Sequence, residues 1–162
     1  MKVRAATFGD AAAIARVQVA SWQAAYRELI PASRLAAFTV PVRTVAWQRN
    51  LREPSGVRTT VFDGDDGVTG FASVGASREL RGWGEIWSIY VAPDAWGRGV
   101  GSGLFADAIG ALAARGLASV MLWVLEGNGR ALRFYQGGGF VLDGTRKVDD
   151  GLPQLRLRRA GS

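Results

Sequence analysis

The chain has 162 residues and a mass of 17.3 kDa, and its residues are 48% hydrophobic and 21% charged. This size and composition are typical of one soluble globular domain over residues 1–162, and they exclude collagen-like, disulfide-stapled and mainly disordered chains. The absence of Cys and His also excludes Cys nucleophiles, Ser-His-Asp arrangements, iron–sulfur clusters and His-based metal sites. Acid–base chemistry must therefore use Asp, Glu, Tyr, Lys or water, and no metal is expected.

The protein is strongly basic, with a net charge of +6 and a pI of about 10.7. Every basic residue except Lys2 and Lys147 is an arginine, a side chain suited to bidentate phosphate recognition, so anionic partners are favoured. The basic residues are scattered singly, which argues against a nucleic-acid partner. The sequence has no signal-peptide core and no stretch approaching the roughly 20 apolar residues of a membrane span. We therefore expect no membrane partner and a cytoplasmic location.

The first part of the chain is predicted to be helical. Thr7, followed three residues later by Asp10, has the spacing of an N-terminal helix cap. The spacing of apolar residues predicts a helix over 8–28, in which Trp22 and Tyr26 form an i, i+4 aromatic pair. A broken helical region that restarts at Pro41 follows.

Beyond residue 56 the pattern predicts an antiparallel meander, a strand–helix–strand crossover and a final hairpin, so the fold class is mixed α/β (α+β). In the last strand Leu155 and Leu157 alternate with Arg156 and Arg158, which predicts one buried and one solvated face. The predicted elements after the first helices are strands 57–62, 68–76 and 84–91, helix 100–115, strand 118–125, helix 128–136, and strands 140–147 and 152–158; one short strand at 3–5 precedes them all.

A glycine-rich stretch from Trp96 to Gly103 joins the strand at 84–91 to the next helix. Glycine lets backbone N–H groups come close to a ligand, and a helix N-terminus carries partial positive charge, so the stretch favours phosphate binding. Its spacing fits neither G-x-x-x-x-G-K-S/T nor G-x-G-x-x-G, which argues against a P-loop and a Rossmann site. The alternative is a flexible loop with a glycine-rich helix entry.

A second segment begins at Asn128, which follows a buried strand and can cap the helix at 128–136. Tyr135 lies at the end of this helix, before the glycines at 137–139. Taken alone, the segment is typical of an ordinary capped helix with an aromatic end.

Together the two segments resemble the Gcn5-related N-acetyltransferase (GNAT) family. That family's first signature, Q/R-x-x-G-x-G/A, follows a strand ending in aromatic-Val-x-Pro; here Tyr90-Val91-Ala92-Pro93 precedes Trp96-Gly97-Arg98-Gly99-Val100-Gly101. Its second signature is N-x-x-A-x-x-F-Y followed by G-F, which is matched by Asn128, Ala131, Phe134, Tyr135, Gly139 and Phe140. The order of elements agrees over nearly the whole chain. The first signature has one departure, because Trp96 stands in place of a Gln or Arg that helps to hold the pyrophosphate.

The resemblance implies the GNAT acyl-CoA N-acyltransferase fold and transfer of an acetyl group from acetyl-CoA to a primary amine, without a covalent enzyme intermediate. The pyrophosphate would lie on backbone amides of residues 97–102, and the pantetheine amides would pair with the backbone of residues 89–91. An N–H near Val91 would stabilise the oxyanion. The cofactor-binding residues that the resemblance implies are Ile89, Tyr90, Val91, Trp96, Gly97, Arg98, Gly99, Val100, Gly101, Ser102, Asn128, Ala131 and Phe134.

Two residues receive catalytic roles from the resemblance. Tyr135 matches the general acid that protonates the leaving CoA thiolate. Glu85 lies six residues before Val91, where several family members have a general base. Regular strand alternation places Glu85 on one face with Trp87 and Ile89, and partly apolar surroundings would raise its pKa. The alternative is a surface glutamate.

Trp22, Tyr26 and Trp87 are candidates for the amine pocket, where aromatic rings stack on a substrate or hold a cation; core packing is the alternative. The first expectation for the acceptor is a small-molecule amine, and the second is a protein N-terminus or Lys. Two other classes of function stay open: an acyl-CoA sensor without turnover, because of Trp96, and a basic nucleic-acid-binding domain. Family members are often homodimers, which leaves a homodimer open here.

Overall fold

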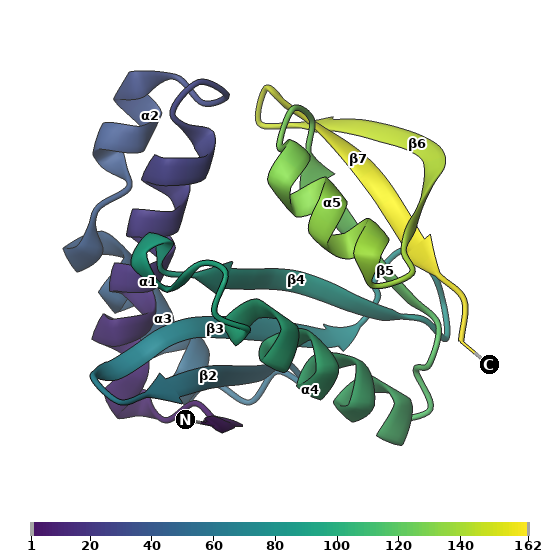
Figure 1. The fold of residues 1–162 in the computed structure, drawn as a ribbon, viewed down its shortest axis with the longest axis horizontal. Helices are drawn as coiled ribbons and strands as arrows, with labels where there is room; N and C mark the ends of the chain where they lie inside the picture. The colour runs from purple at the N-terminus through teal and green to yellow at the C-terminus, as the bar shows by residue number, and fades with distance from the viewer. Residues whose placement is uncertain (1, 162) are drawn as a thin grey trace.

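The computed structural model describes residues 2–161, whose seven strands form one sheet (Figure 1). The strand order is β1-β2-β3-β4-β5-β7-β6, and all neighbouring pairs are antiparallel except β4 and β5, which are parallel. The arrangement confirms the predicted meander, crossover and hairpin. The strands are β1 (Lys2–Ala5), β2 (Arg58–Gly64), β3 (Gly67–Ala76), β4 (Gly84–Val91), β5 (Val120–Leu125), β6 (Val141–Asp149) and β7 (Leu152–Arg159).

Helices cover both faces of the sheet (Figure 1). On one face, Ile14 and Trp47 from two helices pack against Phe71 of β3; on the other, Ala72 of β3 packs against Leu104. The first face carries α1 (Ala11–Tyr26) and α3 (Val40–Arg52), with the short α2 (Ala32–Ala37) beyond them, and the second carries α4 (Val100–Ala114) and α5 (Gly129–Gly137). Alternating residues of β3 therefore serve two separate clusters, as the two-residue period of a strand requires.

The helix boundaries follow local signals in the sequence. The predicted helix at 8–28 begins with a 3₁₀ turn, Phe8–Asp10, and the α-helix proper starts one residue later. The N–H of Thr7 donates to the Asp10 carboxylate at 2.8 Å, which confirms the predicted cap. The broken region resolves into α2 and α3, and α3 begins at Val40 because the Thr39 hydroxyl accepts the N–H of Val42.

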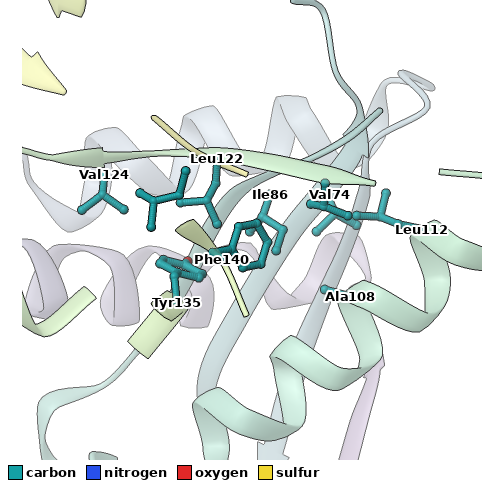
Figure 2. Packing of buried hydrophobic residues seen from close by; sticks show 10 residues of the cluster. Val74, Ile86, Ala108, Leu112, Leu122, Val124, Tyr135 and Phe140 are labelled. Atoms are coloured by element: carbon teal, nitrogen blue, oxygen red, sulfur yellow. The ribbon is translucent and has the colours of Figure 1, made fainter. Parts of the chain in front are cut away.

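The largest cluster of buried residues joins α4 and α5 to the middle of the sheet (Figure 2). Leu112 and Ala108 of α4 pack at one end of the cluster, and Tyr135 and Phe140 lie at the other, beside Val124 of β5. Tyr135 is only 8% exposed. This packing fixes the position of α5, and with it the position of the Tyr135 side chain.

The sheet divides between β4 and β5. These two strands pair at only two positions, Gly84 with Val120 and Glu85 with Met121, although β4 continues to Val91. Beyond Glu85 the two strands separate, so backbone groups of β4 on this edge have no strand partner. The chain therefore has an opening in the middle of its sheet, between the meander and the terminal hairpin.

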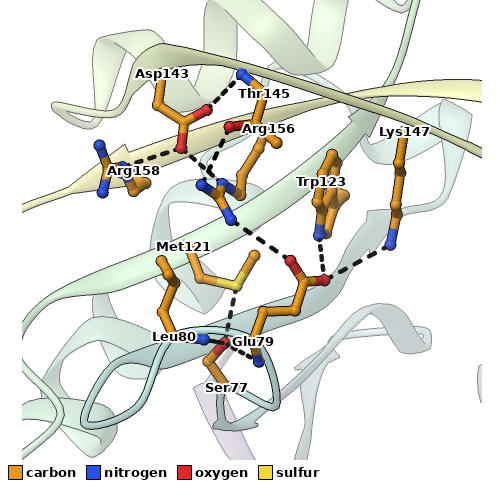
Figure 3. A network of polar contacts seen from close by, with 10 residues as sticks. All are labelled: Ser77, Glu79, Leu80, Met121, Trp123, Asp143, Thr145, Lys147, Arg156 and Arg158. Atoms are coloured by element: carbon orange, nitrogen blue, oxygen red, sulfur yellow. Dashed lines mark hydrogen bonds and ion pairs between the residues drawn. The ribbon is translucent and has the colours of Figure 1, made fainter.

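One expectation for the last strand is wrong. Arg156 was expected on a solvated face, but its side chain is only 15% exposed. Its Nε lies 2.6 Å from the Asp143 carboxylate, and one Nη lies 3.5 Å from Glu79 (Figure 3). Asp143 of β6 and Glu79 of the loop before β4 cover this face of β7 with carboxylates, which the pattern of β7 alone does not indicate. Among residues 2–161, no helix is both long and apolar enough to cross a membrane.

Candidate active site

A cavity of about 490 Å³ occupies the opening between β4 and β5. Its walls come from α1, β4, the glycine-rich loop, the start of α4, β5 and α5. No Asp or Glu of the described chain lines it, whereas Arg130 and Arg133 do. The cavity brings together these residues singled out from the sequence: Tyr26, Trp87, Ile89, Tyr90, Val91, Trp96, Gly97, Gly99, Val100, Gly101, Ser102, Asn128, Ala131, Phe134 and Tyr135.

The glycine-rich loop supplies the end of the cavity nearest α4. Gly97 and Gly99 adopt positive φ angles of 75° and 84°, which residues with a Cβ rarely adopt. A Cβ on Gly101 would lie 3.2 Å from the Phe134 ring, so α4 and α5 approach closely there. The loop thus turns into the N-terminus of α4 with its amides beside the cavity, a setting that suits an anion. The side chain of Arg98 is exposed and is not among the lining residues.

Trp96, the departure from the first signature, has a fixed place in the wall. Its indole Nε1–H donates to the carbonyl of Val91 at 2.9 Å. The same carbonyl accepts the hydroxyl of Ser21 at 3.0 Å, so α1, β4 and the loop meet at one atom. The guanidinium carbon of Arg130 lies 3.7 Å from the centre of the Trp96 ring.

Backbone groups at the end of β4 face the cavity. The N–H of Ala92 donates to the carbonyl of Thr69 of β3 at 2.8 Å. Backbone groups of adjacent residues in a strand point in opposite directions. The N–H and C=O of Val91 therefore point away from β3, and the contacts of its carbonyl with Ser21 and Trp96 agree with this direction. Val91 presents an N–H donor at the opening of the sheet.

Tyr135 projects from α5 into the cavity. The side chain of Asn128 caps this helix by accepting the N–H of Ala131 at 3.2 Å, as expected from the sequence. Burial, reinforced by the nearby Tyr90, raises the pKa of the Tyr135 phenol above its usual value. Within residues 2–161 no side chain or backbone group hydrogen-bonds to its hydroxyl, which is thus a protonated donor available to a ligand.

Glu85 does not line the cavity, and its neighbours differ from those expected. The register between β3 and β4 shifts between Ser73 and Val74, so β4 carries an extra residue, Trp87. Glu85 and Trp87 share a face, but the shift moves Ile89 to the other face, where it packs with the α4 cluster. The expectation of one face for all three residues is therefore wrong, because a bulge interrupts the alternation.

Glu85 is buried, with 7% of the residue exposed, at the last position where β4 pairs with β5. Burial is the main cause that raises its pKa; the negative charge of Glu79 adds to the shift, and Lys147 and Arg78 oppose it. Figure 3 shows that Glu79 is itself held by the indole N–H of Trp123, at 2.9 Å, and by Lys147. A raised pKa is what a general base near neutral pH needs.

The three aromatic candidates for the amine pocket lie in different places. Tyr26 and Trp87 line the cavity, and the Tyr26 hydroxyl lies 3.5 Å from that of Tyr90. Trp22 makes the expected contact with Tyr26, at 5.2 Å between ring centres, but it stacks on Phe38 and lines a second cavity of about 840 Å³ on the α1–α3 side.

Sequence reasoning missed several lining residues. Trp123 was missed because a buried strand gave no signal for which side chains face an opening. For Arg130 and Arg133 a signal existed, since they flank Ala131 and Phe134 within the second signature. The missed residues are Ser21, Ala25, Ile86, Ser88, Ala95, Trp123, Val124, Leu125, Arg130 and Arg133.

Comparison with known proteins agrees with this geometry. The family model described as the acetyltransferase (GNAT) family matches residues 22–140. An uncharacterized N-acetyltransferase, YuaI, from Bacillus subtilis is 35% identical over 160 residues, which cover 93% of this chain and 90% of the relative. Mycothiol acetyltransferase from Stackebrandtia nassauensis is 40% identical over 91 residues, which cover 55% of this chain but only 29% of that protein.

A solved structure shows the same fold. The PaiA N-acetyltransferase of Thermoplasma acidophilum, in complex with coenzyme A, superposes with a TM-score of 0.74 at 18% identity, over 96% of each chain. The family match and the nearly full-length relative support the assignment of the family, and the superposition supports the fold. The chain therefore belongs to the GNAT family and is an acetyl-CoA-dependent N-acetyltransferase.

Proposed function

We propose that this enzyme acetylates a primary amine of a small molecule by direct attack within a ternary complex. The observation that carries the proposal is the cavity through the divided sheet. Residues of the glycine loop, Val91 and Tyr135 all line it. In the reaction, the amine nitrogen forms the new C–N bond and the C–S bond of the thioester breaks. One proton leaves the nitrogen, and one is delivered to the sulfur.

The binding roles follow from the groups that each wall offers. Amides of residues 97–102 and the N-terminus of α4 hold the diphosphate of acetyl-CoA, and the lining without carboxylates leaves that charge unopposed. Backbone groups of Ile89 and Val91, which have no partner strand on this edge, pair with the pantetheine amides. The N–H of Val91 donates to the thioester oxygen as negative charge develops on it. Asn128, Ala131 and Phe134 form the facing wall from α5.

Tyr135 is the proposed general acid. Its raised pKa keeps the phenol protonated across the working pH range, so the group enters each turnover as a donor. The sulfur gains negative charge as the C–S bond breaks, and the hydroxyl donates its proton to it. The position of Tyr135 is held by its packing in the largest core cluster (Figure 2), so the donor needs no reorganisation.

Glu85 is the proposed general base, acting through water. The carboxyl lies outside the cavity lining, but the two residues that follow it, Ile86 and Trp87, are part of that lining. Deprotonated Glu85 would accept, by way of a water molecule, the proton that leaves the amine. The raised pKa makes it a better acceptor than an ordinary glutamate, while it remains ionised above that pKa.

The walls near α1 support a small acceptor. There the cavity is bounded by Ser21, Ala25 and Tyr26 on one side, and by Trp87 and Trp123 on the other. Aromatic rings on both sides can pack against an aromatic or aliphatic amine, and they can hold the protonated, cationic form of the amine before it loses its proton. A protein N-terminus or a Lys side chain is the competing acceptor, which the assay must include.

The test is release of free CoA thiol with a panel of primary amines and short peptides, using wild type and Tyr135→Phe. We expect turnover with at least one small amine and a loss of about 10²- to 10⁴-fold in kcat for Tyr135→Phe. Binding of acetyl-CoA and thermal stability should be unchanged, because the hydroxyl has no partner in the described protein. Turnover with peptides alone would assign a protein acceptor. Binding without any turnover would favour a sensor.

A further inference from the structure

We propose that Arg130, stacked on Trp96, supplies to the diphosphate of acetyl-CoA the side-chain N–H donors that Gln or Arg at position 96 would supply in the family signature, together with a positive charge. The inference deepens the proposed function and rests on its placement of acetyl-CoA in the cavity. Trp96 is then a platform that positions a guanidinium from another element, instead of a defect in the signature.

The first argument is the geometry of the pair. The guanidinium carbon of Arg130 lies 3.7 Å from the centre of the Trp96 ring, which is a close stacking distance. The indole is held in turn by its hydrogen bond to Val91. A guanidinium that uses its face for stacking keeps its edge N–H groups free, and those groups match phosphate oxygens. The stacked arrangement is therefore pre-organised for an anion.

The second argument is charge. Arg130 forms no ion pair with any carboxylate of residues 2–161, whereas Arg4 of β1 pairs with two carboxylates and Arg156 of the hairpin pairs with Asp143. No acidic side chain in that part of the chain lines the cavity either. An exposed guanidinium that is held over a ring at the cavity wall and has no carboxylate partner favours an anionic ligand.

The third argument is the position of Arg130 and Trp96 in the cavity, because it indicates which anion they bind. Trp96 is adjacent in sequence to Gly97, the first glycine of the loop whose amides line the cavity. Arg130 lies in the first turn of α5, and the cap residue of that helix, Asn128, lines the same cavity. The guanidinium and the loop amides thus face one site. Two kinds of positive group converge there, as expected for a doubly charged diphosphate.

The test measures binding of three ligands by calorimetry: CoA, 3′-dephospho-CoA and pantetheine, which has no phosphate. The variants are Arg130→Ala, Arg130→Lys, Trp96→Ala and the double alanine variant. The control is Arg16→Ala, which removes the same charge from an exposed position of α1. Unfolding of each protein without ligand shows that it is folded.

We expect Arg130→Ala to weaken CoA and dephospho-CoA by about 10- to 100-fold, as for a lost hydrogen bond to a charged group. Pantetheine binding and the Arg16→Ala control should be unchanged. Arg130→Lys should lose part of the affinity, because an ammonium neither stacks flat nor donates as a fork. Trp96→Ala should also weaken CoA, and the double variant should bind as Arg130→Ala does, because the two residues act as one unit.

Three results would overturn the inference. In the first, Arg130→Ala binds CoA as well as wild type does. In the second, the loss appears for CoA but not for dephospho-CoA, which would move the contact to the 3′-phosphate. In the third, the binding free energy lost in the double variant equals the sum of the losses in Arg130→Ala and Trp96→Ala. Failure of the proposed placement of acetyl-CoA in the cavity looks different, since wild type itself would then bind none of the three ligands.

Discussion

Asp10 anchors the first strand to the first helix through a partly buried ion pair. Its carboxylate accepts two hydrogen bonds from the Arg4 guanidinium, at 2.9 and 3.0 Å, and one from the Thr7 N–H at 2.8 Å. Arg4 also donates to Asp63 of β2 at 2.9 Å. The side chain of Asp10 is 12% exposed and that of Arg4 is 31% exposed, so solvent screens this pair in part. The hydrogen bonds from Arg4 are the main cause that lowers the pKa of Asp10 from 3.8 to about 2.

We expect Asp10→Asn to lower the free energy of unfolding by about 2 kcal/mol at pH 7, because each pKa unit is about 1.4 kcal/mol of differential interaction. For a domain of this size the loss is roughly 4–8 °C in Tm. A carboxylate whose pKa is lower in the folded protein stabilises the fold above its unfolded pKa. That contribution is lost as the pH falls from about 4 towards 2.

The assay is urea unfolding of wild type and Asp10→Asn at pH 7, 5 and 3, with Asp66→Asn as a matched control at an exposed turn. The difference between wild type and Asp10→Asn should be largest at pH 7 and should shrink between pH 5 and 3. The control should show no such trend. A difference that is independent of pH would refute the electrostatic argument, because it would reflect lost packing alone.

Three further outcomes follow from particular side chains. Glu85→Gln should raise Tm at pH 7 while it lowers kcat, and the gain in Tm should vanish near pH 4. Folding raises the pKa of Glu85, so the ionised carboxylate destabilises the fold, and this cost appears as the pH rises above the pKa of the unfolded chain. Gly70→Ala should lower the free energy of unfolding by about 1–3 kcal/mol in urea titrations, because a Cβ there would lie 2.8 Å from Val100 and 2.9 Å from Leu104; an unchanged midpoint would show that α4 shifts freely. Gly99→Ala has open space but a φ of 84°, so calorimetry should show a loss of about 1 kcal/mol from backbone strain alone.

Local signals in the sequence were sufficient for most of the fold and for much of the site. The glycine loop and the cap at Asn128 depend on backbone rules that act within a few residues, and both lie where the sequence placed them. The helix predicted at 100–115 is likewise found as α4, Val100–Ala114. Signals of this kind need no knowledge of distant segments.

Features that depend on distant segments were missed. The stacking of Arg130 on Trp96 joins α5 to the loop before α4, and nothing within either segment indicates the other. Arg156 was assigned to solvent because β7 alone shows alternation, whereas its burial depends on Asp143 and on Glu79 from another loop. In each case the determining partner is remote in sequence, so periodicity carries no information about it.

The bulge in β4 explains both the error over Glu85 and the origin of the cavity. Glu85 pairs with Met121 at the last position where β4 and β5 are hydrogen-bonded, and the extra residue, Trp87, comes two positions later. A bulge bends its strand and increases the local twist, so β4 turns away from β5 just beyond this point. The same irregularity that moves Ile89 to the opposite face therefore opens the sheet. It frees the backbone of residues 89–91 from a strand partner, so the place where simple alternation fails is the place where the fold makes room for a substrate.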